Sequence, residues 1–277
     1  MSVNRICSGT VLYNPNIELL KKHLNSIKNQ VDRIYLVDNG SSNIVEISNV
    51  VQTYDKLELI SNKKNYGIAK ALNQLFEKAK ANEYDWIITF DQDSICDGKL
   101  VEDLKSELLK EQSVGVMAPI IIDRNVGVVG HNPSKRQDVR TCITSGSLTS
   151  IKAWEKIGKY DEKMFIDSVD FEFCYRMRKS GFRVIQTPAV KMSHAVGEAE
   201  KCRFLFWTFR NYVHSPFRHY YMAQNRVYFP KKHRLLGRFI RGNIRNLRSI
   251  LIVLLYEDNK KNKITNIIKG WKHGLAM

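Results

Sequence analysis

The sequence predicts an α/β fold in which a mostly parallel, doubly wound sheet is followed by a basic helical region. Strand-like and helix-like segments alternate up to residue 91 in the order β-α-β-α-β-α-β, and strands joined by helical crossovers run parallel. Residues 86–90 form a short apolar run, typical of a central strand buried on both faces. The net charge of +16 is concentrated beyond residue 200.

Apolar periodicity and turn residues predict the elements in order. Ile6–Tyr13 is the first expected strand, and Asn14 and Pro15 predict the cap and first turn of a helix. Residues 123–140 predict an irregular loop of the kind that often covers substrates. The other expected strands are 34–37, 57–60, 86–90, 114–122, 182–186 and 190–192. The other expected helices are 47–51, 68–79, 100–108 after a cap at Asp97, and one that leads from 165–178 to Gly181.

Composition divides the chain near residue 200. Residues 1–200 hold 27 Lys and Arg against 26 Asp and Glu, whereas residues 201–277 hold 17 against 2. We therefore expect an α/β domain over 1–200 and a basic helical region over 201–277. A neutral body with a basic tail predicts an anionic partner, either nucleic acid or a lipid surface.

From Pro230 onward the pattern predicts an amphipathic helix. Its apolar stripe contains Leu236, Ile240, Ile244, Leu247, Leu251 and Leu254, and another face carries Arg238, Arg241, Arg245 and Arg248. Such a helix typically lies flat in a membrane interface, with its arginines towards anionic headgroups. The alternative is a helix that packs on its own domain and leaves a solvated basic face.

Several features predict a cytoplasmic protein that is peripheral on the inner face of the plasma membrane. No apolar run is long enough to cross a bilayer, and the N-terminus is unlike a signal peptide. The 5 cysteines contain no Cys-x-x-Cys pair, which is typical of a reducing compartment.

Carboxylates follow two of the expected parallel strands. Asp38 ends the second strand, and Asp91 and Asp93 follow the fourth. Because unpaired charge is costly to bury, they should face the ligand crevice at the carboxyl edge of the sheet. Asp91 and Asp93 suit Mg²⁺ or Mn²⁺ shared with a diphosphate, or else form an acidic loop before the next helix. Asp38 suits either the N3–H of uracil or thymine or an Asx turn.

Other α/β and nucleic-acid-binding classes fit less well. The chain has no Gly-x-Gly-x-x-Gly after its first strand and no P-loop motif. A sugar nucleotidyltransferase needs a Gly-rich, basic loop there, which residues 11–14 lack. A nucleic-acid-binding protein is the alternative that the basic tail suggests, but it leaves the strand-end motifs unexplained.

Five segments carry a resemblance to a known family. VLYNP, VDNGS, NYGIAKALN, FDQDS and FIDSVDFEFCYRMRKSGF, in this order, resemble inverting family-two glycosyltransferases of the GT-A fold, and within them bacterial rhamnosyltransferases. HSPFRHYYMAQNRVYF and KGWKHGL are similar to the same group. The resemblance implies transfer of L-rhamnose from dTDP-rhamnose to a lipid-linked cell-surface polysaccharide such as O-antigen or capsule, without nucleic acid as partner. A UDP-sugar is the alternative donor, and a homodimer is left open.

The resemblance also implies roles for individual residues. Tyr13 and Asp38 would hold the nucleoside, Asp91 would contact its ribose, and Asp93 would bind Mg²⁺ or Mn²⁺. His194, in a His-x-x-Gly position, would be a second metal ligand or a diphosphate contact. The residues that would line the nucleoside side are Asn65, Gly67 and Asn73.

The reaction needs a general base that takes the proton of the acceptor hydroxyl as it attacks the anomeric carbon. Asp167, Asp170 and Glu172 compete for this role. On a helix Asp167 and Asp170 share a face, and Glu172 points elsewhere. The resemblance favours Asp170 and leaves Asp167 as its rival, with a helix-capping role as the structural alternative for Asp170. The family often has Glu-Asp where this chain has Val169-Asp170.

Overall fold

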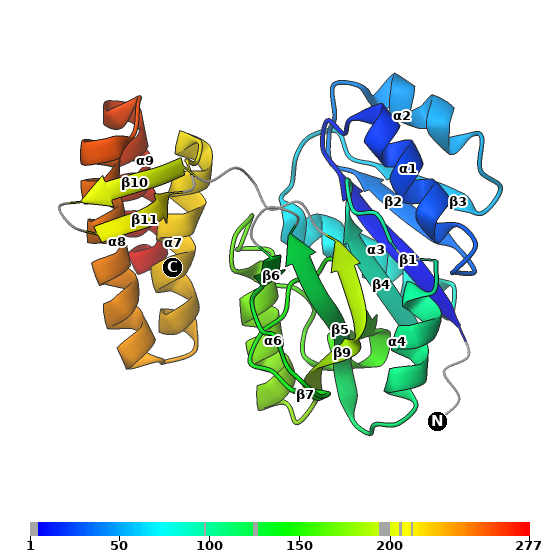
Figure 1. Ribbon diagram of the computed structural model, residues 1–277. Coiled ribbons are helices and arrows are strands. Elements are labelled where there is room, and N and C mark those ends of the chain that lie inside the picture. The colour runs from blue at the N-terminus through cyan, green and yellow to red at the C-terminus, as the bar shows by residue number, and fades with distance from the viewer. Residues whose placement is uncertain (1–4, 97, 124–126, 194–199, 205–206, 212) are drawn as a thin grey trace. The chain divides into compact units, whose positions relative to one another are not determined.

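The computed structural model describes residues 5–96, 98–123, 127–193, 200–204, 207–211 and 213–277. The chain forms two compact units (Figure 1). The first unit contains Met1–Lys163 and Val169–Ala195, and the second contains Met164–Ser168 and Val196–Met277. The assignment of domains to 1–200 and 201–277 stays a prediction.

Among the described residues, the first unit is built on a nine-stranded sheet. The strand order is β3-β2-β1-β4-β8-β5-β9-β7, and β6 pairs with β5. Strands β3, β2, β1 and β4 are parallel, as are β5 and β9, whereas β8 runs antiparallel to both β4 and β5. The strands are β1 Ile6–Leu12, β2 Ile34–Asp38, β3 Leu57–Ser61, β4 Trp86–Asp91, β5 Val114–Asp123, β6 Gly127–Val129, β7 Gln137–Asp138, β8 Ser147–Ser150 and β9 Arg183–Ser193.

Six helices of the described first unit accompany the sheet. Apolar residues of α1, α2 and α4 join the main buried cluster, whereas Phe76 of α3 packs on Trp154 and Tyr160. The expected α/β sheet and the helical C-terminal region are thus confirmed. The helices are α1 Ile17–Ile27, α2 Ile44–Val51, α3 Ile68–Ala81, α4 Leu100–Leu108, α5 Ile151–Lys156 and α6 Val169–Lys179.

The expected start of the first helix was wrong. Helix α1 begins at Ile17, and Asn16 caps it by accepting a hydrogen bond from the Leu19 backbone N–H. Asn14 has a φ of 47° and accepts hydrogen bonds from Ser42 instead. Two asparagines flank Pro15, and spacing alone does not decide which of them reaches the free N–H groups of the first turn.

The second half of the sheet also differs from the expectation. The two strands expected at 182–186 and 190–192 are one strand, β9, whose pairing with β5 is irregular between Thr187 and Lys191. Pro188 lies in this irregularity and cannot donate to the ladder. Strand β8 was not expected, and the loop predicted at 123–140 contains the short strands β6 and β7. The expected cap Asp97 lies outside the described residues.

The second unit contains three helices and a hairpin among its described residues. These are α7 Pro216–Lys232, α8 Leu236–Tyr256, α9 Lys260–Ala276, β10 Glu200–Phe204 and β11 Trp207–Asn211. The amphipathic helix expected from Pro230 is present as α8, but it begins at Leu236, because Pro230 still lies inside α7, which ends at Lys232. Helix α7 contacts both α8 and α9. A Cβ at Gly242 or Gly270 would overlap the carbonyl oxygen of Arg226 or Tyr220 of α7, so glycine permits this close approach.

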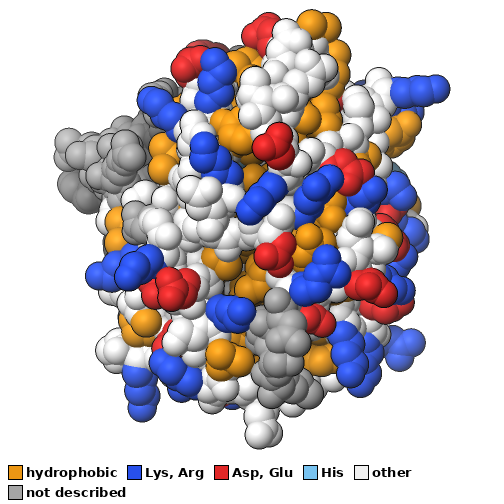
Figure 2. Space-filling model, turned by 90° about the vertical axis from the view of Figure 1, so that its right-hand side faces the viewer, with side chains coloured by type: hydrophobic (Ala, Val, Ile, Leu, Met, Phe, Trp, Pro, Cys, Tyr) orange, Lys and Arg blue, Asp and Glu red, His pale blue; other side chains and the backbone are white. Residues whose placement is uncertain are grey.

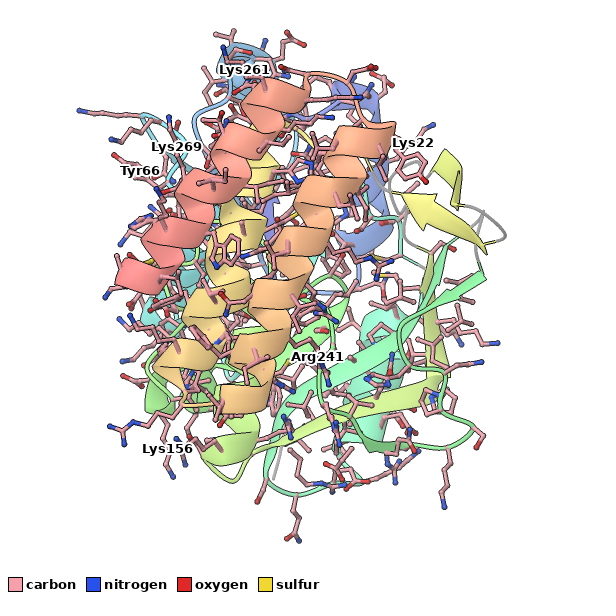
Figure 3. The ribbon with its side chains drawn as sticks, turned by 90° about the vertical axis from the view of Figure 1, so that its left-hand side faces the viewer. Lys22, Tyr66, Lys156, Arg241, Lys261 and Lys269 are labelled. Atoms are coloured by element: carbon pink, nitrogen blue, oxygen red, sulfur yellow. The ribbon has the colours of Figure 1, made fainter. Side chains whose placement is uncertain are left out.

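Helix α8 buries its small and polar side and exposes its apolar stripe. Gly242, Asn246 and Val253 are its buried residues. The exposed large apolar side chains range from 47% to 71% exposure and are Leu236, Ile240, Ile244, Leu247, Leu251, Leu254 and Leu255. Figure 3 labels Arg241 on α8, and Lys261 and Lys269 on α9. Among the helices that the structure describes, none has both the length and the apolar content needed to cross a bilayer.

The face on the side of α1 and α2 has a different composition. Figure 2 shows Lys and Arg side chains interspersed there with Asp and Glu. This mixture matches the balanced charge of residues 1–200.

Candidate active site

The strand-end carboxylates come together at one edge of the sheet. Strand β1 pairs in parallel with both β2 and β4, so that Leu12 lies opposite Asp38 and Val11 lies opposite Asp91. The two aspartates therefore flank the end of β1. Asp93, two residues after Asp91, is exposed.

Gln92 joins the loops that follow β1 and β4. Its Oε1 accepts a hydrogen bond from the Tyr13 backbone N–H at 2.9 Å, and its Nε2 donates to the Tyr13 carbonyl at 3.4 Å. The Tyr13 ring remains half exposed, where a nucleobase can reach it. Sequence analysis missed Gln92, although an amide placed between two strand-end aspartates was a usable signal.

Asp38 forms the Asx turn that its Asp-Asn-Gly context allowed. Its carboxylate accepts from the backbone N–H groups of Gly40 and Ser41 at 3.2 to 3.3 Å, and the residue is only 1% exposed. A carboxylate offers about four acceptor positions, so the turn does not use all of its capacity. A contact with a base would nevertheless require this loop to shift and expose the side chain.

Asn39 connects Asp38 to Asn65 and Gly67. The Asn39 Nδ2 donates to Asn65 Oδ1 at 2.9 Å and to the Gly67 carbonyl at 3.2 Å. Its Oδ1 accepts from the Tyr66 N–H. Two expected donor-lining residues thus lie beside the β2 loop, while Asn39, which holds them, was missed in a motif that had been singled out only for Asp38.

Asn73 belongs to a different network. It is buried, and its Nδ2 donates to the Tyr160 carbonyl and to Glu162 at 3.0 and 2.9 Å. Its Oδ1 accepts from the Trp154 indole N–H and the Tyr160 N–H. These bonds match the donor and acceptor capacity of an amide, so the geometry gives Asn73 a structural role.

A buried chain of hydrogen bonds supports the loop that carries Asp91 and Asp93. Ser145 Oγ accepts from the Asp91 N–H at 3.1 Å and lies 2.9 Å from Ser94 Oγ. Burial lowers the pKa of His23 to about 4, so its imidazole is neutral at pH 7. His23 Nδ1 therefore donates to the Ser94 carbonyl at 2.7 Å, and Nε2 accepts from the hydroxyl of Thr10 at 2.9 Å.

Asp91 and Asp93 fit a divalent cation that is shared with a substrate. Mg²⁺ is usually held by one or two carboxylates together with substrate phosphates, without a complete protein cage. Within the described ranges, no group of three His, Cys, Asp or Glu side chains gathers as such a cage. His194 lies outside the described residues. Ser193, which precedes it, forms a bridge with Ile95, two residues after Asp93.

The three candidates for the general base differ in their positions and in their partners. Asp170 lies in the first turn of α6 and lines a small cavity with Cys142, Thr144 and Ser147. The same loop supplies Ser145 to Asp91, so Asp170 and the strand-end carboxylates share one supporting loop. Glu172 is fully buried and paired bidentately with Arg176, whose Nε and Nη2 donate to Glu172 Oε1 and Oε2, both at 2.8 Å.

Asp167 lies in the second unit and is paired with Arg218, whose Nε lies 3.4 Å from its carboxylate. The described cavities offer two further observations about the first unit. A cavity of about 390 Å³ is lined by Ser145, Ser147, Phe171 and Gln186, so it adjoins the loop shared by Asp91 and Asp170. A larger one of about 1050 Å³ is lined by residues that precede β4 and β5, at the opposite edge of the sheet.

Comparison with known proteins identifies the family. Residues 10–182 match the family model "Glycosyl transferase family 2". The chain is 28% identical to the dTDP-rhamnosyl transferase RfbF of Shigella flexneri, over 93% of this chain and 90% of that protein.

Solved structures of GT-A enzymes share the fold. S. aureus TarS with UDP-GlcNAc gives a TM-score of 0.63 at 15% identity, over 98% of this chain and 81% of that one. The mannosyltransferase PcManGT of Pyrobaculum calidifontis, in complex with GDP-Man and Mn²⁺, gives 0.60 at 13% identity, over 98% and 75%. The matched family model covers the strand-end carboxylates and Asp170 alike, and the chain belongs to glycosyl transferase family 2.

Proposed function

We propose that this glycosyltransferase moves L-rhamnose from dTDP-rhamnose to a lipid-linked saccharide that becomes cell-surface polysaccharide, with inversion at the anomeric carbon. The observation that carries the donor is the 28% identity to a dTDP-rhamnosyl transferase along 93% of the chain. A UDP-sugar is the second candidate, because the TarS structure contains UDP-GlcNAc.

The donor would lie along the carboxyl edge of β2, β1 and β4. The exposed Tyr13 ring, Asn65 and Gly67 would line the nucleoside, Asp38 would contact its base after the loop shifts, and Asp91 would contact the ribose. Asn73 would support this wall from within the fold, since its amide is already bonded to residues 154–162.

Asp93, with Asp91 beside it and His194 as a further ligand, would hold Mg²⁺ or Mn²⁺. Such a cation neutralises a diphosphate leaving group without proton transfer. The PcManGT structure, which contains Mn²⁺, supports a metal of this kind.

Asp170 would act as the base. A carboxylate in the first turn of a helix is stabilised in its ionised form, and a base must be ionised to accept a proton. The acceptor sugar would enter the cavity lined by Phe171 and Gln186, next to Asp170 in the chain. A single displacement with this geometry inverts the configuration.

The second unit would bring the enzyme to an anionic membrane surface, where a lipid-linked acceptor resides. The support is the exposed apolar stripe of α8, flanked by its arginines. An amphipathic helix of this composition is typical of the membrane interface. We place the protein in the cytoplasm, peripheral on the inner membrane face.

Thermal stabilisation by nucleotide sugars tests the donor and the metal together. With Mn²⁺ present, dTDP-rhamnose well above its dissociation constant should stabilise the fold by about 2–4 kcal/mol, and GDP-mannose should not. In Asp93→Asn or in EDTA the metal-dependent part should vanish while the unliganded melting temperature stays unchanged. Stabilisation by GDP-mannose alone would contradict the assignment of the donor. Full transfer activity in EDTA would contradict the requirement for a metal.

A further inference from the structure

The turn that precedes α6 has an unusual backbone. Asp167 and Ser168 have φ values of 70° and 60°, and two successive non-glycine residues rarely adopt this left-handed conformation. It persists only where the surroundings hold it. Helix α6 begins at the next residue, Val169, and Asp170 follows. Whatever holds 167–168 therefore decides where the helix that carries Asp170 begins.

One buried amide on α7 holds this turn. The Nδ2 of Asn225 donates to the carbonyl oxygens of Ile166 and Asp167, both at 2.8 Å, and Asn225 is 1% exposed. Its Oδ1 accepts from Gln224 Nε2 at 3.3 Å, which fixes the amide with its NH₂ group towards the turn. Two neighbouring carbonyls converge on one nitrogen, and only an atom with two N–H bonds satisfies both; an aspartate in this place would have no donor.

Two other turns of α7 hold the same segment. Tyr221 stacks on Phe165, with ring centroids 4.7 Å apart, and Arg218 pairs with the Asp167 carboxylate. Residues 218, 221 and 225 are spaced by three and four, so they lie on one helix face. The segment Met164–Ser168 belongs to the same compact unit as α7.

We propose that Asn225 is a positioning residue for sugar transfer. By fixing the left-handed turn at 167–168, it sets the first turn of α6 and with it the carboxylate of Asp170. The inference rests on the proposed function, in which Asp170 is the base. Because Asn225 acts through the backbone ahead of the base, its loss should affect the chemical step and leave the binding of the donor intact.

The test compares two buried asparagines of the same unit. Asn225→Ala removes the bonds to the turn, and the matched control Asn246→Ala removes a buried amide that donates to the Ala223 carbonyl at 3.0 Å. A misplaced catalytic group costs up to roughly 100-fold in rate. We expect kcat to fall about 10- to 100-fold in Asn225→Ala, with the donor KM within about twofold of wild type. Asn246→Ala should lower the melting temperature and keep kcat per folded molecule.

Unchanged kcat in Asn225→Ala, or an equal loss in both variants, would overturn the proposal. If Asn225→Ala fails to fold, Tyr221→Leu is the second variant, because it removes the stacking on Phe165 at a half-buried position. It should also lower kcat. Amide hydrogen exchange over residues 164–172 reports on the order of this turn without any enzyme assay. The exchange rate should rise in Asn225→Ala but not in the control Asn246→Ala. A wild-type enzyme that transfers no rhamnose would refute the proposed function before any variant is compared, and the exchange result would still decide whether Asn225 fixes the turn.

Discussion

In the first unit the apolar stripe of α1 lies inside the protein, whereas in the second unit the apolar stripe of α8 lies outside. Leu20, Leu24 and Ile27 are fully buried in the main core. Leu247 and Leu251 are each more than half exposed, although both helices have comparable amphipathic patterns. Folding accounts for the apolar stripe of α1 but not for that of α8, whose packing side consists of glycine, asparagine and valine. The stripe of α8 therefore needs a surface outside the unit.

The largest expected effect separates the two units by function and compares one aspartate from each, Asp170 and Asp167. Asp170→Asn should bind the donor normally and lose roughly two to four orders of magnitude in turnover. Asp167→Asn should retain most of its turnover, since Asp167 belongs to the second unit and is paired with Arg218. Turnover, donor affinity and melting temperature are measured on both variants. The reverse outcome would move the base to Asp167, and a loss of about 1 kcal/mol in stability with normal turnover would reduce Asp170 to a helix cap.

A buried histidine in each unit predicts how the two respond to acid. Burial lowers the pKa of His23 from 6.5 to about 4, so the unfolded chain binds a proton in this interval that the folded chain does not. The contribution of His23 to stability is complete above pH 6.5 and is lost as the pH falls towards 4, by about 3 kcal/mol. Burial also lowers the pKa of His219, whose imidazole faces Glu257.

Chemical denaturation between pH 4 and 7 measures the effect of His23 as the difference between wild type and His23→Gln. The variant should show a shallower loss of stability in acid. Parallel profiles of the two proteins would show that folding does not lower the pKa of His23.

The close approach of the helices in the second unit predicts a moderate loss of stability when a glycine at the contact gains a side chain. Gly270→Ala would place a methyl group against the Tyr220 carbonyl, and overpacking of this kind typically costs about 1–3 kcal/mol. The control is Gly237→Ala on α8, where a Cβ meets no atom within 4 Å and helix propensity should improve stability by about 0.5–1 kcal/mol. Equal melting temperatures of the two variants would contradict the close contact.

The smallest expected effect on stability belongs to the exposed stripe itself. Leu247→Ala should change the free energy of unfolding by no more than about 0.5 kcal/mol, whereas the buried control Leu24→Ala should lose about 2–5 kcal/mol. The same Leu247 variant should bind anionic liposomes more weakly than the wild-type protein. Added salt should weaken the binding of the wild-type protein to these liposomes. A core-sized loss in Leu247→Ala, or a wild-type protein that ignores liposomes at low salt, would remove the membrane surface from the proposal.

Strong local patterns predicted the parallel half of the sheet well. The apolar runs that became β1, β2, β3 and β4 are separated by helical periods, and Asp38 and Asp91 came to one edge because parallel register places them there. Strand β8 was missed because Ser147–Ser150 contains a single large apolar side chain. Its strand conformation comes from the two neighbours it pairs with and not from its own residues.

Sequence patterns predicted where the strand-end aspartates lie, but not the hydrogen bonds that surround them. Asp91 and Asp93 follow from the end of an apolar run, but the hydrogen bonds of Gln92, Asn39 and Ser145 link segments that are far apart in the chain. Asn73 shows the converse, because an asparagine on a helix has no local sign of the side to which its amide is bonded. The hydrogen bonds from Asn225 to residues 166 and 167 span 59 and 58 residues, and no local pattern could have predicted them.

The position of β8 between β4 and β5 has a consequence for synthesis on the ribosome. When the nascent chain has emerged as far as residue 140, β4 has its β1 neighbour but an open second edge. Strand β5 by then lacks both β8 and β9. Open strand edges pair readily with other chains. The half-made enzyme therefore passes through an interval of exposed edges that closes only when residues 147–150 and 183–193 arrive.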